Sequence, residues 1–67
     1  MDGQDLKTLI GKKLYITCSF NGKTVFYTGI IVKLNDSSVL ILDKFNNEVL
    51  INLGSILKVE VFSNADR

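Results

Sequence analysis

The sequence predicts a small, mainly β domain in which one short helix precedes a strongly bent, five-stranded antiparallel barrel. Two observations predict this fold class. Most of the chain consists of short runs rich in Val, Ile, Leu, Phe, Tyr and Thr, separated by Gly, Asn, Asp and Ser, which is typical of β-strands and turns. In the longest run, residues 24–35, Gly29 interrupts the strand. A glycine there marks a bend, a bulge or a close backbone approach, and a hairpin bent at Gly29 can serve two sheets at once.

The expected helix spans about residues 2–10. Asp2 or Asp5 can cap its first turn, its apolar residues recur at helical spacing, and Gly11 follows the last of them. The apolar stripe consists of Leu6, Leu9 and Ile10. A helix this short is marginal alone, so we expect it to pack this stripe on the rest of the domain.

The expected strands span residues 13–20, 24–35, 38–45, 48–53 and 56–62. The first strand alternates apolar and polar residues, so one face of it is expected to lie in the core. Asn21-Gly22 follows that strand and predicts a tight hairpin turn. Further turns are expected at residues 35–38, at Asn46-Asn47 and at Gly54-Ser55. The chain has no internal repeats and no linkers, and a single domain is expected over residues 1–67.

Residues 39–42 and 49–51 are apolar on both faces of their strands. Two-faced apolar strands require cover on both sides, but a barrel of this size has only one interior. We therefore expect self-association, in which the fourth and fifth strands are sheet edges that pair between subunits. The residues expected at this subunit interface are Val49, Ile51, Leu53, Leu57, Val59 and Val61.

The composition argues against catalysis. The chain has no histidine, and its net charge is +1. The single Cys18 alternates with apolar residues in an expected strand and is interpreted as a small buried hydrophobic residue. Neither a nucleophile motif nor a phosphate loop occurs, so we expect no enzyme activity, no metal and no cofactor. The lack of a disulfide framework, of a secretory leader and of an apolar membrane span favours a cytoplasmic protein that does not enter a membrane.

The order of the elements resembles the Sm/LSm family, which includes the bacterial Hfq proteins. The resemblance covers about residues 5–62. It is carried by LIGKKL at residues 9–14, by GIIVKLND at residues 29–36, which is similar to the first Sm motif, and by INLGSI at residues 51–56, which is similar to the second. It implies a homo-oligomeric ring of about five to seven subunits, assembled through the fourth and fifth strands. It also implies that two turns in each subunit bind an unstacked RNA base.

The chain departs from this family where the base pocket is expected. Val39 stands where the family has an Asn, Leu53 precedes Gly54 where the family has a basic residue, and neither turn contains an aromatic residue for stacking. Hydrogen-bonding side chains and a nearby lysine remain in and beside the turns. The candidate nucleic-acid-binding residues are Asn35, Asp36, Ser37, Ser38, Lys33, Asn52, Gly54 and Ser55. Tyr15, Phe26 and Tyr27 are candidates for a stacking face elsewhere if they point outward.

The resemblance therefore implies a ring that binds single-stranded RNA, or DNA, without catalysis and acts in nucleic-acid processing. A structural or protein-interaction ring without base recognition is the alternative, and the near-neutral charge and the altered pocket favour it. A monomeric adaptor with an SH3-like barrel is the third possibility.

Overall fold

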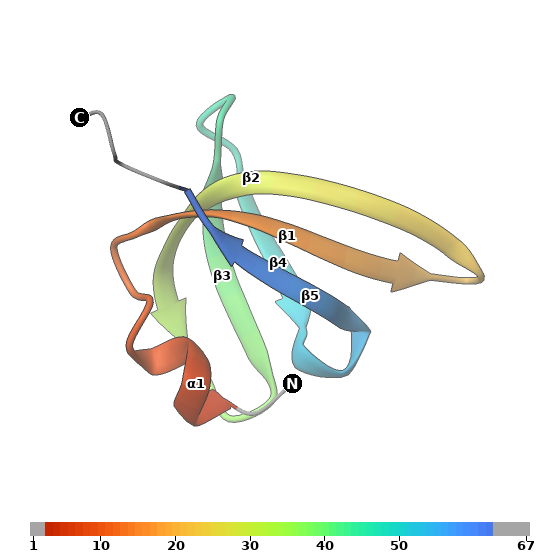
Figure 1. The fold of residues 1–67 in the computed structure, drawn as a ribbon, viewed down its shortest axis with the longest axis horizontal. Coiled ribbons are helices and arrows are strands. Elements are labelled where there is room, and N and C mark those ends of the chain that lie inside the picture. The colour runs from red at the N-terminus through yellow and green to blue at the C-terminus, as the bar shows by residue number, and fades with distance from the viewer. Residues whose placement is uncertain (1–2, 63–67) are drawn as a thin grey trace.

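The computed structural model describes residues 3–62 (Figure 1). These residues form a mainly β structure with one short α-helix and a five-stranded antiparallel sheet, which confirms the expected secondary-structure class and strand number but not the closed barrel. The elements in chain order are α1 (Gly3–Lys7), β1 (Lys13–Phe20), β2 (Lys23–Leu34), β3 (Ser38–Asp43), β4 (Glu48–Asn52), the 3₁₀ turn η1 (Leu53–Ser55) and β5 (Ile56–Val61).

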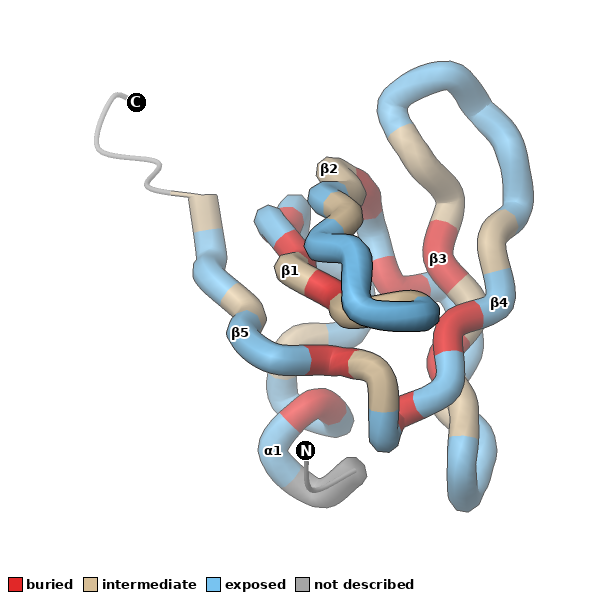
Figure 2. The backbone as a smooth tube through the Cα atoms, turned by 90° about the vertical axis from the view of Figure 1, so that its right-hand side faces the viewer, coloured by how far each residue is buried: buried red, intermediate tan, exposed pale blue. Residues whose placement is uncertain are grey.

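The strands are arranged in the order β4-β3-β2-β1-β5, and each pairs with its neighbour in antiparallel register. Within residues 3–62 the two end strands, β4 and β5, do not pair with each other, so the sheet is strongly curved but not closed. Figure 2 shows β4 and β5 on opposite sides of the curved sheet, joined through η1. Each therefore presents one unpaired backbone edge within the described part of the chain.

The longest strand, β2, changes partner halfway along its length. Residues 23–30 pair with β1 and residues 29–34 pair with β3, so only Gly29 and Ile30 are paired on both sides. A Cβ built at Gly29 would overlap the carbonyl oxygen of Leu42, which shows that β2 and β3 approach each other closely here. The register shift lies slightly further on, between Ile31 and Lys33. Gly29 thus permits the close approach, while the irregularity that adds curvature is at Val32.

The core is an apolar cluster enclosed by the curved sheet and sealed at one end by α1. The alternating burial of β1, β3 and β4 places one face of each strand inside (Figure 2). Leu6 of α1 is only 1% exposed, so this helix packs the Leu6 side chain into the core. The buried apolar residues are Leu6, Leu14, Ile16, Cys18, Ile31, Val39, Ile41, Ile51, Leu53 and Ile56.

The helix is shorter than the sequence pattern predicts. It ends at Lys7 rather than near Ile10, and the chain continues in turns to Gly11, whose φ is +85°. The backbone N–H of Leu9 donates to the carbonyl of Leu6 at 2.9 Å, a three-residue spacing that belongs to a tight turn. Ile10 is 46% exposed and does not extend the buried stripe, and Asp2 lies outside the described residues.

The strand ends differ from the predicted bounds by one or two residues. β2 begins one residue earlier than expected and ends at Leu34, β4 ends at Asn52 and β5 ends at Val61. The largest difference is in β3, which stops at Asp43 instead of residue 45. There the Oδ1 atom of Asp43 accepts hydrogen bonds from the backbone N–H groups of Phe45 (2.8 Å) and Asn47 (2.9 Å). This side chain diverts the backbone into a loop, a local side-chain effect that apolar periodicity does not encode.

Candidate nucleic-acid interface

The turn between β2 and β3 is closed by its own polar groups. The backbone N–H of Asn35 donates to the carbonyl of Ser38 at 2.9 Å, and its side-chain Nδ2 donates to Ser38 Oγ at 3.3 Å. Asn35 therefore has a turn-forming role whether or not it meets a ligand. Asp36 and Ser37 lie at the tip of the turn and are exposed.

The second predicted turn lies directly beside the first. The backbone N–H of Leu53 in η1 donates to the carbonyl oxygen of Ser37 at 2.9 Å, and Ser38 pairs with Asn52 in the β3–β4 register. Leu53 is 7% exposed, so its side chain anchors η1 in the core while the turn itself faces outward. The structure thus joins two segments that are well separated in the sequence into one surface.

This surface, which we call the polar turn cluster, consists of residues 35–38 together with Asn52, Gly54 and Ser55. Asn52 and Gly54 are exposed, and Ser55 is half-buried. The Asn52 side chain makes no capping hydrogen bond to η1, and a Cβ built at Gly54 would meet no atom within 4 Å. Asn52 and the backbone at Gly54 can therefore meet a ligand without first breaking a described contact. Lys33 is exposed near the end of β2, two residues before Asn35.

The chemistry of the polar turn cluster suits hydrogen bonding rather than stacking. It offers amide and hydroxyl groups, one carboxylate at Asp36 and a lysine nearby, and none of its residues is aromatic. Such groups can bond to base edges and to a 2′-hydroxyl. A neutral hydrogen bond contributes only about 0.5–1.5 kcal/mol after water is displaced, so a single copy of this exposed cluster would bind weakly.

The six residues predicted at the subunit interface divide into two groups. Leu57 and Val61 of β5 are 61% and 47% exposed, while Val49 and Val59 are half-buried. Ile51 and Leu53 instead lie in the core, at 1% and 7% exposure, so their side chains are already enclosed by their own chain.

Leu50 is absent from the residues predicted at the interface, yet it is 63% exposed on the edge strand β4. Leu50 follows Val49 and precedes Ile51, so strand alternation alone indicates that it faces away from both. What alternation does not decide is which of the two faces is buried.

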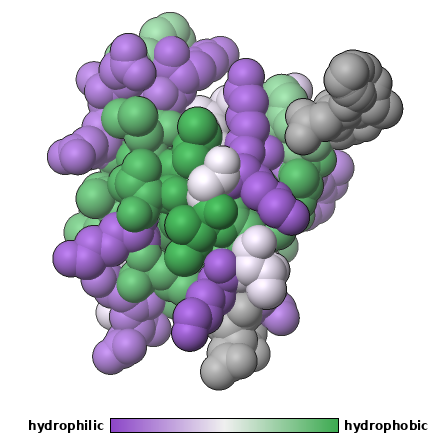
Figure 3. All heavy atoms as spheres, turned by 90° about the vertical axis from the view of Figure 1, so that its left-hand side faces the viewer, coloured by the Kyte–Doolittle hydropathy of each residue, from purple (hydrophilic) through white to green (hydrophobic). Residues whose placement is uncertain are grey.

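An apolar face covers the outside of β2, β3 and β4. Leu40 pairs with Leu50 and Ile30 pairs with Leu42, and Val32 lies nearby at the register shift. Ile30, Val32 and Leu50 are exposed, and Leu40 and Leu42 are half-buried. Figure 3 shows apolar side chains gathered on this side of the molecule. The two-faced apolar strands seen in the sequence therefore leave one face uncovered in the single chain.

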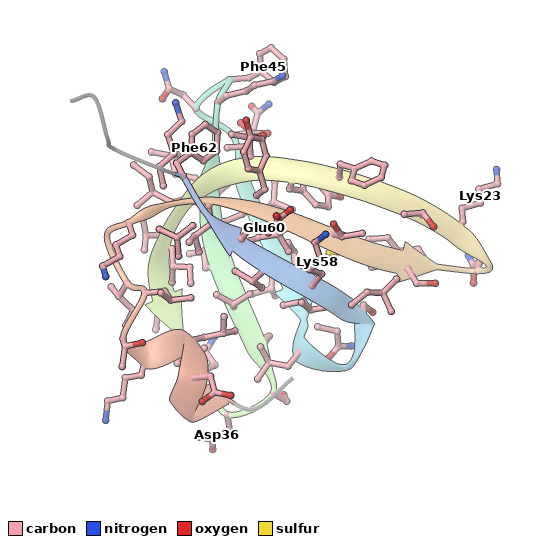
Figure 4. All side chains as sticks on the ribbon, viewed as in Figure 1. Lys23, Asp36, Phe45, Lys58, Glu60 and Phe62 are labelled. Atoms are coloured by element: carbon pink, nitrogen blue, oxygen red, sulfur yellow. The ribbon has the colours of Figure 1, made fainter. Side chains whose placement is uncertain are left out.

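Of the aromatic candidates, Tyr15 and Phe26 are 49% and 74% exposed, whereas Tyr27 packs against the core. The Tyr15 ring stacks on Phe62, with 3.9 Å between the ring centroids. Phe62 is not among the predicted candidates, because the strand pattern places it at a strand end without indicating a neighbour. Figure 4 shows Phe62 far from Asp36, so these rings are not part of the polar turn cluster.

Among residues 3–62, the one cysteine is buried. Burial raises the pKa of the Cys18 thiol above its ordinary value, because the thiolate is poorly solvated in the core. Within residues 3–62 no group of three or more His, Cys, Asp or Glu residues is placed to hold a metal ion. The same part of the chain contains no helix with the length and apolar character needed to cross a membrane.

Searches with protein-family models and among curated proteins find no match to this chain.

Proposed function

We propose that the chain forms a homo-oligomeric, Sm-like ring that binds single-stranded nucleic acid, foremost RNA, without catalysis. The observation that carries this proposal is the position of the polar turn cluster relative to the sheet edges. The hydrogen bond from Leu53 N–H to the Ser37 carbonyl holds the cluster at the junction of β4 and β5, the two edge strands. Any assembly through these edges repeats the cluster at each subunit.

Edge pairing supports the assembly step. The outer edges of β4 and β5 carry unpaired backbone groups, and an antiparallel contact between two copies would pair them. Exposed leucines accompany both edges, with Leu50 on β4 and Leu57 on β5. Each subunit has one edge of each kind, so head-to-tail pairing that closes on itself leaves none unpaired. A closed ring of about five to seven copies meets this condition.

Repetition supports the binding step. One polar turn cluster offers a few modest hydrogen bonds, but a strand that contacts several copies adds their contributions through high effective concentration. The hydroxyl and amide groups match the base edges and 2′-hydroxyls of RNA. The absence of an aromatic residue from the cluster predicts weak affinity per nucleotide at this surface.

A second candidate is an assembly that binds proteins and not bases. The apolar face formed by Ile30, Val32, Leu40, Leu42 and Leu50 favours it, because an uncovered apolar face of a sheet is typical of a protein interaction surface.

Light scattering combined with oligonucleotide binding tests the proposal. The chain mass is 7.5 kDa, so a ring of the proposed size scatters as roughly 38–53 kDa. Fluorescence anisotropy with U-rich, A-rich and mixed RNA strands and with the matching DNA strands, at two salt concentrations, measures affinity and base preference. Tight binding that weakens with salt is the expected result.

Asn52→Ala is the most direct variant, because the Asn52 side chain makes no capping hydrogen bond. Its matched control is Asn47→Ala, at an exposed asparagine in the β3–β4 loop whose described hydrogen bonds use only the backbone. We expect Asn52→Ala to weaken RNA binding about 3- to 10-fold per affected contact and Asn47→Ala to leave it unchanged. Equal affinities of the two variants would exclude the polar turn cluster as the binding surface, and a monomer mass would exclude the ring.

A further inference from the structure

We propose that a second surface, formed by Tyr15, Phe26 and Phe45 with Lys13 and Lys44, is a stacking platform for single-stranded nucleic acid. It lies on the outer side of β1 and β2 and on the β3–β4 loop, away from the polar turn cluster (Figure 4). The proposal goes beyond the function proposed above, because it requires neither the ring nor the turns. We call this surface the aromatic platform.

Hydrogen bonds and strand register bring its parts together. Tyr15 lies opposite Thr28 in the β1–β2 register, and Phe26 lies opposite Thr17, which makes Phe26 a diagonal neighbour of Tyr15 on the same face. The backbone N–H of Lys44 donates to the carbonyl of Thr28 at 3.1 Å. The β3–β4 loop is thereby attached to β2 beside these rings, although it is far from β1 in the sequence.

The rings are exposed, and described contacts fix the backbone at Phe45 and the ring of Tyr15. Phe26 and Phe45 are 74% and 72% exposed, the highest values among the exposed large hydrophobic residues of the described chain. The backbone at Phe45 is fixed, because its N–H donates to Asp43 Oδ1 at 2.8 Å. Tyr15 is braced by Phe62, whose ring is stacked on it at an interplanar angle of 17°. Phe62 therefore acts as a positioning residue for Tyr15.

Cations accompany the rings. Lys13 Nζ lies 4.8 Å from the centroid of the Phe62 ring, and Lys44 Nζ lies 5.3 Å from that of Phe45. The nearby carboxylate of Glu60 is 3.5 Å from Lys58 Nζ, so β5 adds no net charge at this point. The Asp43 carboxylate accepts loop hydrogen bonds. Lys13 and Lys44 are thus the cations placed beside ring faces.

Exposed ring faces with ammonium groups beside them fit a single-stranded nucleic acid as the partner. Every base has a π-face that can stack on an exposed aromatic ring, and a phosphate follows each base along a single strand. Phe26, Phe45 and the remaining face of Tyr15 can take bases, while Lys13 and Lys44 contact phosphates. Because stacking tolerates any base, we expect the platform to bind U-rich, A-rich and dT strands with similar affinity.

The platform is tested with the full chain, fluorescein-labelled ten-nucleotide oligo-U and oligo-A RNA, and oligo-dT. We expect Phe26→Ala and Phe45→Ala each to weaken the binding of all three oligonucleotides about 5- to 150-fold, which corresponds to the loss of one stacked base. Phe26→Tyr and Phe45→Tyr keep a ring and should keep near wild-type affinity. Ile10→Ala, at another exposed apolar residue, is the matched control and should change nothing. Thermal melts check that each variant is folded.

The lysines provide an independent readout. Two phosphate contacts per chain predict a slope of about −1.4 for log affinity against log salt concentration on a single strand, and Lys13→Gln or Lys44→Gln should each reduce its magnitude by about 0.7. NMR spectra should show shifts of the Phe26 and Phe45 ring protons on adding oligo-U.

The outcomes separate the two proposals. If Phe26→Ala and Phe45→Ala lose binding and Asn52→Ala does not, the aromatic platform is supported and the polar turn cluster is excluded as the binding surface. Loss in Asn52→Ala alone overturns the platform while leaving the proposed function intact. A wild-type chain that binds no oligonucleotide at low salt overturns both and directs attention to a protein partner for these rings.

Discussion

Replacing Gly29 by alanine tests whether the approach of β2 to β3 requires a residue without a side chain. The added Cβ would overlap the carbonyl oxygen of Leu42 and lie 3.1 Å from the Cα of Asp43. Both atoms belong to the backbone, so neither can move aside by changing a rotamer. Relief requires β2 and β3 to separate at the position where β2 passes from one partner strand to the other.

The expected loss of stability follows from three contributions. An extra methyl group in a packed site costs about 1–3 kcal/mol, and weakening one strand-pairing hydrogen bond adds about 1 kcal/mol. Against these, alanine restricts the unfolded chain and stabilises by up to about 1 kcal/mol. We expect the free energy of unfolding to fall by about 2 kcal/mol, out of roughly 3–10 kcal/mol for a domain of this size. The corresponding fall in Tm is about 8–16 °C.

Urea and thermal denaturation followed by circular dichroism measure this effect, at one fixed protein concentration because any self-association also shifts Tm. Gly54→Ala is the control without a steric clash, because a Cβ at that position would have no atom within 4 Å and the φ of Gly54 is not positive. Its free energy of unfolding should stay within about 0.5 kcal/mol of the wild-type value. A Cβ at Gly22 would also meet no atom within 4 Å, but Gly22 has a φ of +78°. The free energy of unfolding of Gly22→Ala should therefore fall by about 1–2 kcal/mol through the strained backbone conformation alone. Equal stability of the Gly29 and Gly54 variants would refute the steric argument.

Burial and hydrogen bonding determine how four other side chains respond to substitution. Leu50→Asp should leave the chain folded and disrupt the proposed ring, which light scattering would show as a lower mass. Ile51→Asp should unfold the chain, because a charge would enter the core, and a folded Ile51→Asp would contradict the assigned strand faces. Asp43→Ala should lower the free energy of unfolding by about 1–3 kcal/mol in urea melts through loss of two loop hydrogen bonds, and unchanged melts would count against the loop geometry. Cys18 should react with a thiol reagent only after unfolding. Burial raises the pKa of the Cys18 thiol in the folded chain, so the thiol ionises first in the unfolded chain. Its contribution to the free energy of unfolding is therefore constant below the ordinary pKa of 9.0 and is lost as the pH rises above that value. Cys18→Ala should abolish this loss of stability at high pH.

The sequence by itself determined the local features of this protein. Apolar and β-branched runs identify the five strands, because strand propensity and alternation depend on neighbouring residues. Asn21-Gly22 identifies the first hairpin, and both residues have positive φ in the structure, at 51° and 78°. Gly29 stands out in the sequence because it lies inside a strand-forming run.

Tertiary structure decided the features that depend on residues distant in the chain. Alternation shows that Leu50 and Ile51 face opposite ways, but only the register of β4 on β3 determines that Ile51 is the one in the core. The end of β3 is a different case, because it depends on a local contact that apolar periodicity misses: Asp43 accepts hydrogen bonds from residues two and four positions further on.

The two candidate surfaces are likewise products of long-range contacts. The polar turn cluster depends on the bond from Leu53 to Ser37, and the aromatic platform depends on the stacking of Tyr15 on Phe62. The partners in each pair are more than a dozen residues apart, and no local pattern relates them. They meet because the curved sheet enclosing the apolar core brings β5 alongside β1 and places η1 beside the β2–β3 turn. The sequence thus specified which residues could form strands and turns, and the packing of the core selected which of their side chains meet on the surface.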